Sequence, residues 1–293
     1  MGVSFFFVLS GFILGYNYLE RPPDTHEARK TLRVQSWTPW TAMAWNGAGW
    51  SLAVEAVFYA AFPFLAGRLN RLGNRALAVG AAVAYGAALL FPALYMVVDP
   101  DGTGGTASAY DSGPWMLALR FNPLARLPEF ILGLLAARFF VLRAGAAPRS
   151  HPVALAVVGG GVIAALMGSP SLPFPLLHNG LLAPVFAVLI LLLSWSQGTV
   201  AWVLASRPLL LLGKSSYALF LLHMPVLFAW KSVLKRLGAA PTSAWAVAAF
   251  IVGAVCLSVL AYERVEKPAQ GWIRDRWARR GTEQRAPGLQ PRA

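Results

Sequence analysis

Eight long apolar runs constrain the fold of this 293-residue chain more than any other feature of its sequence. A helix that crosses the hydrocarbon core of a bilayer needs about 20 mostly apolar residues. Runs of this kind cover residues 3–19, 50–68, 76–98, 122–142, 152–168, 177–196, 208–230 and 243–263. The sequence therefore predicts an all-α, polytopic membrane bundle of about eight transmembrane helices over residues 1–263, followed by a basic tail over 264–293.

Composition supports a membrane protein and excludes several other classes. Hydrophobic residues make up 57% of the chain and charged residues only 13%, whereas a soluble domain carries about 25% charged residues. The formal net charge of +13 therefore indicates basic cytoplasmic loops and no nucleic-acid partner. Cys256 is the single cysteine, and CxxC and HExxH spacings are both absent. We accordingly expect neither an intrachain disulfide nor a metal site.

The basic tail predicts how the chain is oriented in the membrane. By the positive-inside rule it is cytoplasmic in a multi-pass protein of the inner membrane, where it can also touch anionic membrane lipid. Threading the chain back from the tail puts residues 20–49 outside, although their first half contains Arg21, Arg29, Lys30 and Arg33. Their second half is aromatic and uncharged and suits the outer interface. One membrane crossing is therefore missing between the two halves.

Ionisable side chains inside spans are costly and mark function by default. Glu55 has Ser51 four residues before it and Tyr59 four residues after it, so the three side chains share one face of a helix. Either Glu55 is a buried carboxyl that is hydrogen-bonded to a neighbouring helix, or this polar face is the wall of a polar cavity. Arg126 and Glu129 are three residues apart, and form either a structural ion pair or part of the same cavity.

His223 is the histidine that lies inside a confident span, with Ser216 seven residues before it on the same face. It is either a satisfied structural residue or the group that transfers a proton, because its ordinary pKa suits that role near neutral pH. In the first run, Gly11 and Gly15 form a GxxxG pattern, which permits close helix packing.

Five segments in order over nearly the whole chain resemble the membrane-bound acyltransferase family 3, the integral O-acyltransferases that modify bacterial surface sugars. Residues 3–12 resemble the family's FFVLSGF helix, and the segment from Trp50 to Pro63 resembles its WSLxxExxFYxxxP element. The other three matches are residues 122–133 to PLxRxxEFxxG, 216–223 to SYxxYLxH, and 262–268 to YRxVExP.

Two parts of the family pattern are missing from the chain. Family members begin one helix earlier, in the helix that carries the family's catalytic histidine, and they have a further span before the WSL element. Ten family helices less these two give the eight runs found here. We expect a truncated or internally deleted member, in which catalysis is either lost or supplied by another residue.

The resemblance implies O-acetylation: transfer of an acyl group, commonly acetyl from acetyl-CoA as co-substrate, to a hydroxyl of a carbohydrate acceptor in polysaccharide biosynthesis. It leads us to expect His223 and Glu55 as catalytic residues and Arg29, Lys30 and Arg33 as the groups that bind the phosphates of CoA. The expected substrate-binding residues are Trp50, Ser51, Tyr59, Arg126, Glu129, Ser216 and Tyr217.

Two other functions stay open. A transporter or flippase for a glycan or a lipid-linked sugar would be expected to have inverted repeats and broken helices, and no internal repeat is visible. A non-catalytic membrane subunit would bind an intact partner and would have no affinity for acetyl-CoA.

Overall fold

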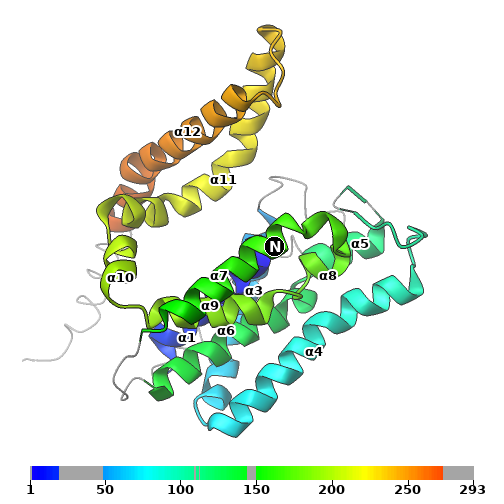
Figure 1. Cartoon of the computed structure of the whole chain (residues 1–293), viewed down its shortest axis with the longest axis vertical. Coiled ribbons are helices and arrows are strands. Elements are labelled where there is room, and N and C mark those ends of the chain that lie inside the picture. The colour runs from blue at the N-terminus through cyan, green and yellow to red at the C-terminus, as the bar shows by residue number, and fades with distance from the viewer. Residues whose placement is uncertain (1, 20–48, 109, 112, 144–149, 273–293) are drawn as a thin grey trace, which may run out of the picture. The chain divides into compact units, whose positions relative to one another are not determined.

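The computed structural model describes residues 2–19, 49–108, 110–111, 113–143 and 150–272, and all of their regular structure is helical (Figure 1). The chain divides into two compact units, residues 1–202 and 203–293, and each is described by itself. The predicted boundary between bundle and tail, at residue 264, stays a prediction, since residues 273–293 lie outside the described residues.

Unit 1 contains most of the predicted spans. Its helices are α1 (Gly2–Tyr18), α3 (Trp50–Leu69), α4 (Asn74–Val98), α5 (Pro114–Phe121), α6 (Pro123–Arg143), α7 (Pro152–Met167), η2 (Ser169–Ser171), α8 (Phe174–His178), α9 (Ala183–Ser194) and α10 (Gly198–Leu204).

Small residues bring α1 against α6. A Cβ on Gly11 would collide with the carbonyl oxygen of Phe130, and a Cβ on Gly15 would come within 2.7 Å of the Cβ of Ala137. On the facing helix, a Cβ on Gly133 would collide with the carbonyl oxygen of Val8. The GxxxG pattern of α1 therefore meets a Gly-xxx-Ala pattern on α6, and the two backbones approach as small residues allow.

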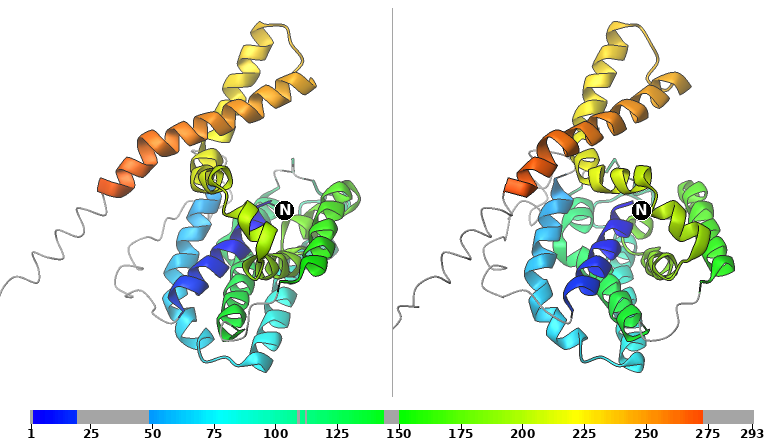
Figure 2. Two further views of the ribbon diagram at one scale, coloured as in Figure 1. Left: turned by 60° about the vertical axis from the view of Figure 1, so that its left-hand side comes forward. Right: turned by 90° about the vertical axis from the view of Figure 1, so that its left-hand side faces the viewer.

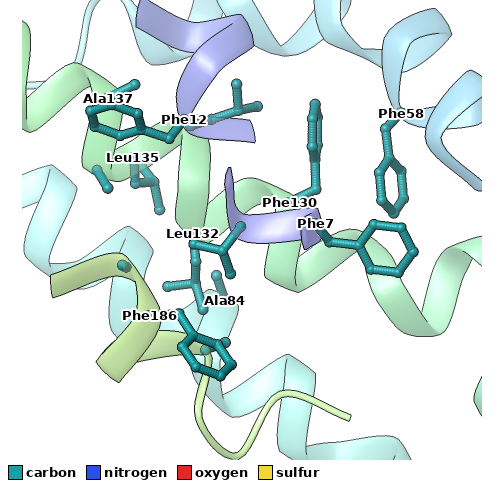
Figure 3. Packing of buried hydrophobic residues seen from close by; sticks show 14 of the residues in the cluster. Phe7, Phe12, Phe58, Ala84, Phe130, Leu132, Leu135, Ala137 and Phe186 are labelled. Atoms are coloured by element: carbon teal, nitrogen blue, oxygen red, sulfur yellow. The ribbon is translucent and has the colours of Figure 1, made fainter. Parts of the chain in front are cut away.

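Aromatic side chains fill the space between α1, α3 and α6 (Figure 3). Phe7 packs edge-on against Phe58 at a centroid distance of 5.2 Å, and Phe58 stacks on Phe130 at 4.8 Å. All three are fully buried. This apolar core fixes the mutual positions of the three helices that carry the polar residues described below.

Helices α1, α3 and α6 run in the same direction (Figure 2). Trp50, the first residue of α3, packs against Phe7 near the start of α1 and against Phe121 just before α6. Tyr18 therefore ends α1 at the end of the unit opposite to Trp50. The crossing expected between α1 and α3 falls on residues outside those described and stays a prediction.

The predicted span 177–196 is not one continuous helix. Helix α8 ends at His178, and α9 begins at Ala183 after a turn in which Gly180 adopts a positive φ of 81°. That conformation is easy for glycine and costly for other residues. A Cβ on Gly180 would also come within 2.6 Å of the Ala88 Cβ, so the turn packs closely on α4.

Unit 2 is built on α11 (Arg207–Arg236) and α12 (Ala244–Ala261), which pack against each other. Trp230 donates from its ring Nε1 to the carbonyl oxygen of Ala246 across the two helices at 2.9 Å. A π-helical turn, η3 (Tyr262–Glu266), continues α12.

Five described segments are long and apolar enough to cross a membrane: Trp50–Leu69, Asn74–Val98, Phe174–Ser194, Arg207–Arg236 and Ala244–Trp272. Gly2–Tyr18 and Pro152–Met167 are apolar but shorter. Helix α6 has the length of a span but contains Arg126, Glu129, Arg138 and Arg143. The all-α membrane bundle is confirmed, while the count of eight spans stays a prediction.

Candidate functional site

A buried polar cluster lies where α1, α6 and α8 meet. Its members are Ser4, Arg126, Glu129 and His178. Arg126 Nη1 and Glu129 Oε1 form an ion pair at 3.2 Å, and both side chains are at most 1% exposed. Ser4 donates from its hydroxyl to the same Glu129 oxygen at 2.9 Å. The i,i+3 pairing predicted from the sequence is therefore present, and it is fully buried.

Backbone carbonyls also accept hydrogen bonds from the arginine. Arg126 Nε donates to the carbonyl oxygen of Arg120 at 3.1 Å, and Arg126 Nη1 donates to the carbonyl oxygen of His178. Ser4 is also within 3.0 Å of that His178 oxygen. The turn after α8 is thus tied to α1 and α6 through a single backbone oxygen.

Several buried polar atoms of this cluster have no hydrogen-bond partner among the residues that the structure describes. They are Arg126 Nη2, Glu129 Oε2 and His178 Nε2, with Asn179 Oδ1 beside them. A buried polar group left unpaired costs about 1–3 kcal/mol. A donor, an acceptor and an imidazole nitrogen are therefore left without a partner within the described part of this buried cluster.

Trp50 forms an aromatic wall of the cluster. The Arg126 guanidinium carbon lies 5.9 Å from the Trp50 ring centroid, within the range of a cation–π interaction. The Trp50 ring also packs against Phe7 and Phe121. Ser51, the next residue, is also fully buried. The structure thus brings the predicted residues Trp50, Arg126 and Glu129 together.

A second polar group, the Glu55 cluster, consists of Ser10, Glu55 and Tyr59. Glu55 Oε1 accepts a hydrogen bond from the Ser10 hydroxyl at 2.6 Å and another from the Tyr59 hydroxyl. Ser10 follows Ser4 by six residues on α1, which is about 9 Å along the helix axis. Tyr59 is 46% exposed, so this cluster opens to the surface of unit 1.

These two clusters combine a buried cation with carboxylates and an imidazole. A positively charged donor, Arg126, can stabilise an oxyanion in a site that excludes water. Carboxylates at Glu55 and Glu129 and an imidazole at His178 can accept hydrogen bonds or protons. Among the residues that the structure covers, no three His, Cys, Asp or Glu side chains gather as a metal site requires.

The remaining predicted residues of α11 lie in unit 2. Ser216 is exposed and donates to the carbonyl oxygen of Gly213 in its own helix, and Tyr217 is 47% exposed. Ring nitrogen Nδ1 of His223 is 2.7 Å from the Phe220 carbonyl oxygen, also in its own helix. That contact suits a structural histidine. A role for these residues beside the clusters of unit 1 stays a prediction.

The basic residues expected to bind CoA, Arg29, Lys30 and Arg33, lie outside the described residues. Apolar cavities lie within the described part of unit 1. One of about 450 Å³ is bounded by the end of α4, by α5 and by the start of α6, and one of about 260 Å³ lies between α4, α6 and α9.

Sequence reasoning missed two members of the buried polar cluster, Ser4 and His178. Ser4 lies within the FFVLSGF-like segment but was not a candidate. His178 lies at the edge of a predicted span. The signal that it is buried was the apolar sequence on both sides of it, from Phe174 to Leu177 and from Leu181 onward.

A family model described as an acyltransferase domain matches residues 26–263, well over half of the chain. No curated protein and no solved structure matches the chain.

Proposed function

The chain belongs to the acyltransferase family 3, as a multi-pass membrane acyltransferase, and we propose that it transfers an acetyl group from acetyl-CoA to a hydroxyl of a surface carbohydrate. The observation that carries this proposal is the buried Arg126–Glu129 pair inside an apolar bundle. Charged side chains are costly within membrane spans and are retained there chiefly for function.

The proposed reaction needs a donor that the described residues can supply. The carbonyl oxygen of the thioester becomes negative in the transition state and needs a donor in a dry site. Arg126 supplies one, because its Nη2 has no protein partner within the described ranges. Glu129 and the backbone carbonyls hold the guanidinium in place, so that little reorganisation is needed when charge develops.

Glu55 is proposed as a second polar contact for the acceptor. Its Oε1 already accepts two hydrogen bonds, from Ser10 and Tyr59, which orient the carboxylate. These two hydrogen bonds also fix the position of the other carboxylate oxygen, which could then bind a sugar hydroxyl in a defined orientation. Trp50 and Ser51 would shape the wall beside the carbohydrate.

The proposed orientation follows from where the two substrates are found. CoA is polyanionic and cytoplasmic, so Arg29, Lys30 and Arg33 would meet its phosphates on that face of the inner membrane. The carbohydrate would approach from the opposite face, near the start of α3. The basic tail over 264–293 would stay cytoplasmic.

The test uses the full chain in lipid nanodiscs and measures both acetyl-CoA binding by calorimetry and release of the CoA thiol. Arg126→Lys keeps the charge but loses the planar fork, and we expect thiol release to fall by about 100-fold, as for loss of an oxyanion donor. Arg143→Lys is the matched control, because Arg143 lies at the far, exposed end of the same helix. A wild-type chain that neither binds nor cleaves acetyl-CoA would contradict the proposal and favour a non-catalytic subunit.

A further inference from the structure

The smaller cavity of unit 1 combines an apolar interior with arginines at one end. It has a volume of about 260 Å³, lies between α4, α6 and α9, and is lined by apolar residues apart from Asn74. We propose that it binds one acyl chain of an anionic phospholipid, whose phosphate group lies against Arg75 and Arg143. This lipid site is independent of the proposed acyl transfer.

The two arginines belong to the end of the cavity where α4 begins and α6 ends. Asn74, the first residue of α4, and Phe139 of α6 both line the cavity. The Arg143 guanidinium carbon lies 4.8 Å from the centroid of the Phe139 ring, and Arg75 directly follows Asn74. In Figure 1 and Figure 2 the start of α4 and the end of α6 lie at the same end of unit 1. Both arginines are exposed, and neither forms an ion pair among the described residues.

The first turn of α4 adds to the positive potential beside the cavity. Backbone N–H groups in the first turn of a helix have no partner within the helix and carry partial positive charge. The residue before the helix is Gly73, which has no side chain to cap them, and the first turn contains no acidic residue. Arg75 is instead a cation at the end of the helix where the dipole favours an anion. A phosphate here would offset both positive contributions.

The shape and lining of the cavity favour a lipid over a soluble phosphate compound. Its volume of about 260 Å³ is below the roughly 300–1,000 Å³ of sites for drug-sized ligands, and therefore suits a slender chain. The nucleotide of CoA or a sugar phosphate would place polar groups against an apolar lining, which is costly.

The cavity also opens in the direction from which a lipid would enter. Ala78 of α4 and Val188 of α9 line it and are exposed. Asn74–Val98 and Phe174–Ser194 are both long and apolar enough to cross a membrane. The opening therefore meets hydrocarbon when these segments span a bilayer.

The location agrees with where anionic lipids attract basic side chains. The positive-inside rule places the end of unit 1 that carries Arg68, Arg71, Arg75 and Arg143 on the cytoplasmic side. Basic pockets between helices on that side of a membrane bind anionic headgroups. The rule accounts for arginines at this end, whereas a lipid site also accounts for the apolar cavity beside two of them.

The experiment measures the binding of the first lipid molecule to the full chain in detergent by native mass spectrometry. The probes are phosphatidylglycerol and phosphatidylcholine with the same acyl chains. Each basic residue near a lipid headgroup contributes about fivefold to the binding of an anionic lipid, so we expect phosphatidylglycerol to be preferred by about 25-fold. The double variant Arg75→Gln with Arg143→Gln should lose this preference, whereas Arg143→Lys keeps the charge and should keep most of it.

The matched control removes the same charge from the same end of the unit. It is the double variant Arg68→Gln with Arg71→Gln, in which Arg68 donates to the Phe64 carbonyl oxygen of its own helix. We expect this variant to keep most of the preference for phosphatidylglycerol, because neither residue adjoins the lining of the cavity.

A second pair of variants tests the cavity itself. Ala78→Phe fills its opening and should weaken the binding of both lipids, and Ala78→Leu is a smaller replacement that keeps the test open if the phenylalanine disturbs folding. Ala76→Phe is the control, since Ala76 is also exposed and points to the opposite side of α4. Bound phosphatidylglycerol should raise the thermal midpoint of the wild type and of Ala76→Phe, but not that of Ala78→Phe.

Three results would overturn the proposal. Equal losses of preference in the two double arginine variants would make it a property of the whole basic surface. Unchanged lipid binding in folded Ala78→Phe would show that no acyl chain enters the cavity. Loss of acetyl-CoA binding in Arg75→Gln with Arg143→Gln, without loss of phosphatidylglycerol binding, would assign these arginines to CoA instead.

Discussion

Gly11 of α1 and Gly133 of α6 lie face to face, and each leaves the space that the backbone of the other helix occupies. A Cβ on Gly11 would collide with the Phe130 carbonyl oxygen, and a Cβ on Gly133 would come within 2.8 Å of the Phe12 amide nitrogen. This contact holds Ser4 of α1 against Glu129 of α6. The candidate site therefore depends on the spacing of two helices.

Replacing either glycine by alanine should separate α1 from α6. We expect Gly11→Ala to lower the free energy of unfolding by about 1–3 kcal/mol, the usual cost of overpacking. Gly86→Ala is the matched control, since nothing lies within 4 Å of a Cβ at that helical position. Thermal unfolding in detergent measures both. Equal midpoints for the two variants would mean that the close approach of α1 and α6 does not contribute to stability.

Removing one partner of the buried ion pair should cost more than removing both. Glu129→Ala leaves the Arg126 charge buried and should destabilise the chain by about 3–5 kcal/mol. The double variant Arg126→Met with Glu129→Leu fills the same volume with apolar atoms and should be less destabilised than Glu129→Ala. Thermal midpoints of the three chains check this order. A double variant that is the least stable of them would show that the pair stabilises the fold on balance.

The helical framework was predictable because hydrocarbon imposes a simple rule on length and polarity. Each predicted apolar run, from 3–19 to 243–263, is helical, except that a turn at Gly180 interrupts the run 177–196. Gly180 has a positive φ, and hydropathy does not reveal such a turn. The Arg126–Glu129 pair was predictable too, since both residues are on one helix. The partnership of Ser4 and Glu129 was not, because it joins residues 125 positions apart and depends on the packing of α1 on α6.

The Glu55 cluster should matter to activity more than to stability. Glu55→Gln keeps the shape of the side chain but removes its charge, and Tyr59→Phe removes one of its two hydrogen bonds. We expect a loss of thiol release of about 10-fold or more for Glu55→Gln and a smaller loss for Tyr59→Phe, because Ser10 still orients the carboxylate. Tyr16→Phe is the control, as Tyr16 is an exposed tyrosine of α1. A larger loss of thiol release in Tyr59→Phe than in Glu55→Gln would contradict a leading role for the carboxylate.

The loop after α4 should respond to acid through Asp99. This residue adopts a positive φ of 45° at the end of the helix, which is strained for a residue other than glycine. Hydrogen bonds from the Thr103 hydroxyl and from the backbone N–H groups of Thr103 and Gly104 hold its carboxylate at 2.7 Å each. They lower the pKa of Asp99 below its ordinary value of 3.8.

A lowered pKa means that the folded loop favours the ionised carboxylate. The stabilisation is therefore present above about pH 4 and is lost as the pH falls through the pKa of the folded loop. Hydrogen exchange of residues 99–104, corrected for intrinsic rates, should increase below pH 4 in the wild type. Asp99→Asn tolerates the same backbone conformation but has no proton to bind, so its corrected exchange should be faster at neutral pH and nearly independent of acid. An unchanged acid response in Asp99→Asn would contradict the role of Asp99 in the acid sensitivity of this loop.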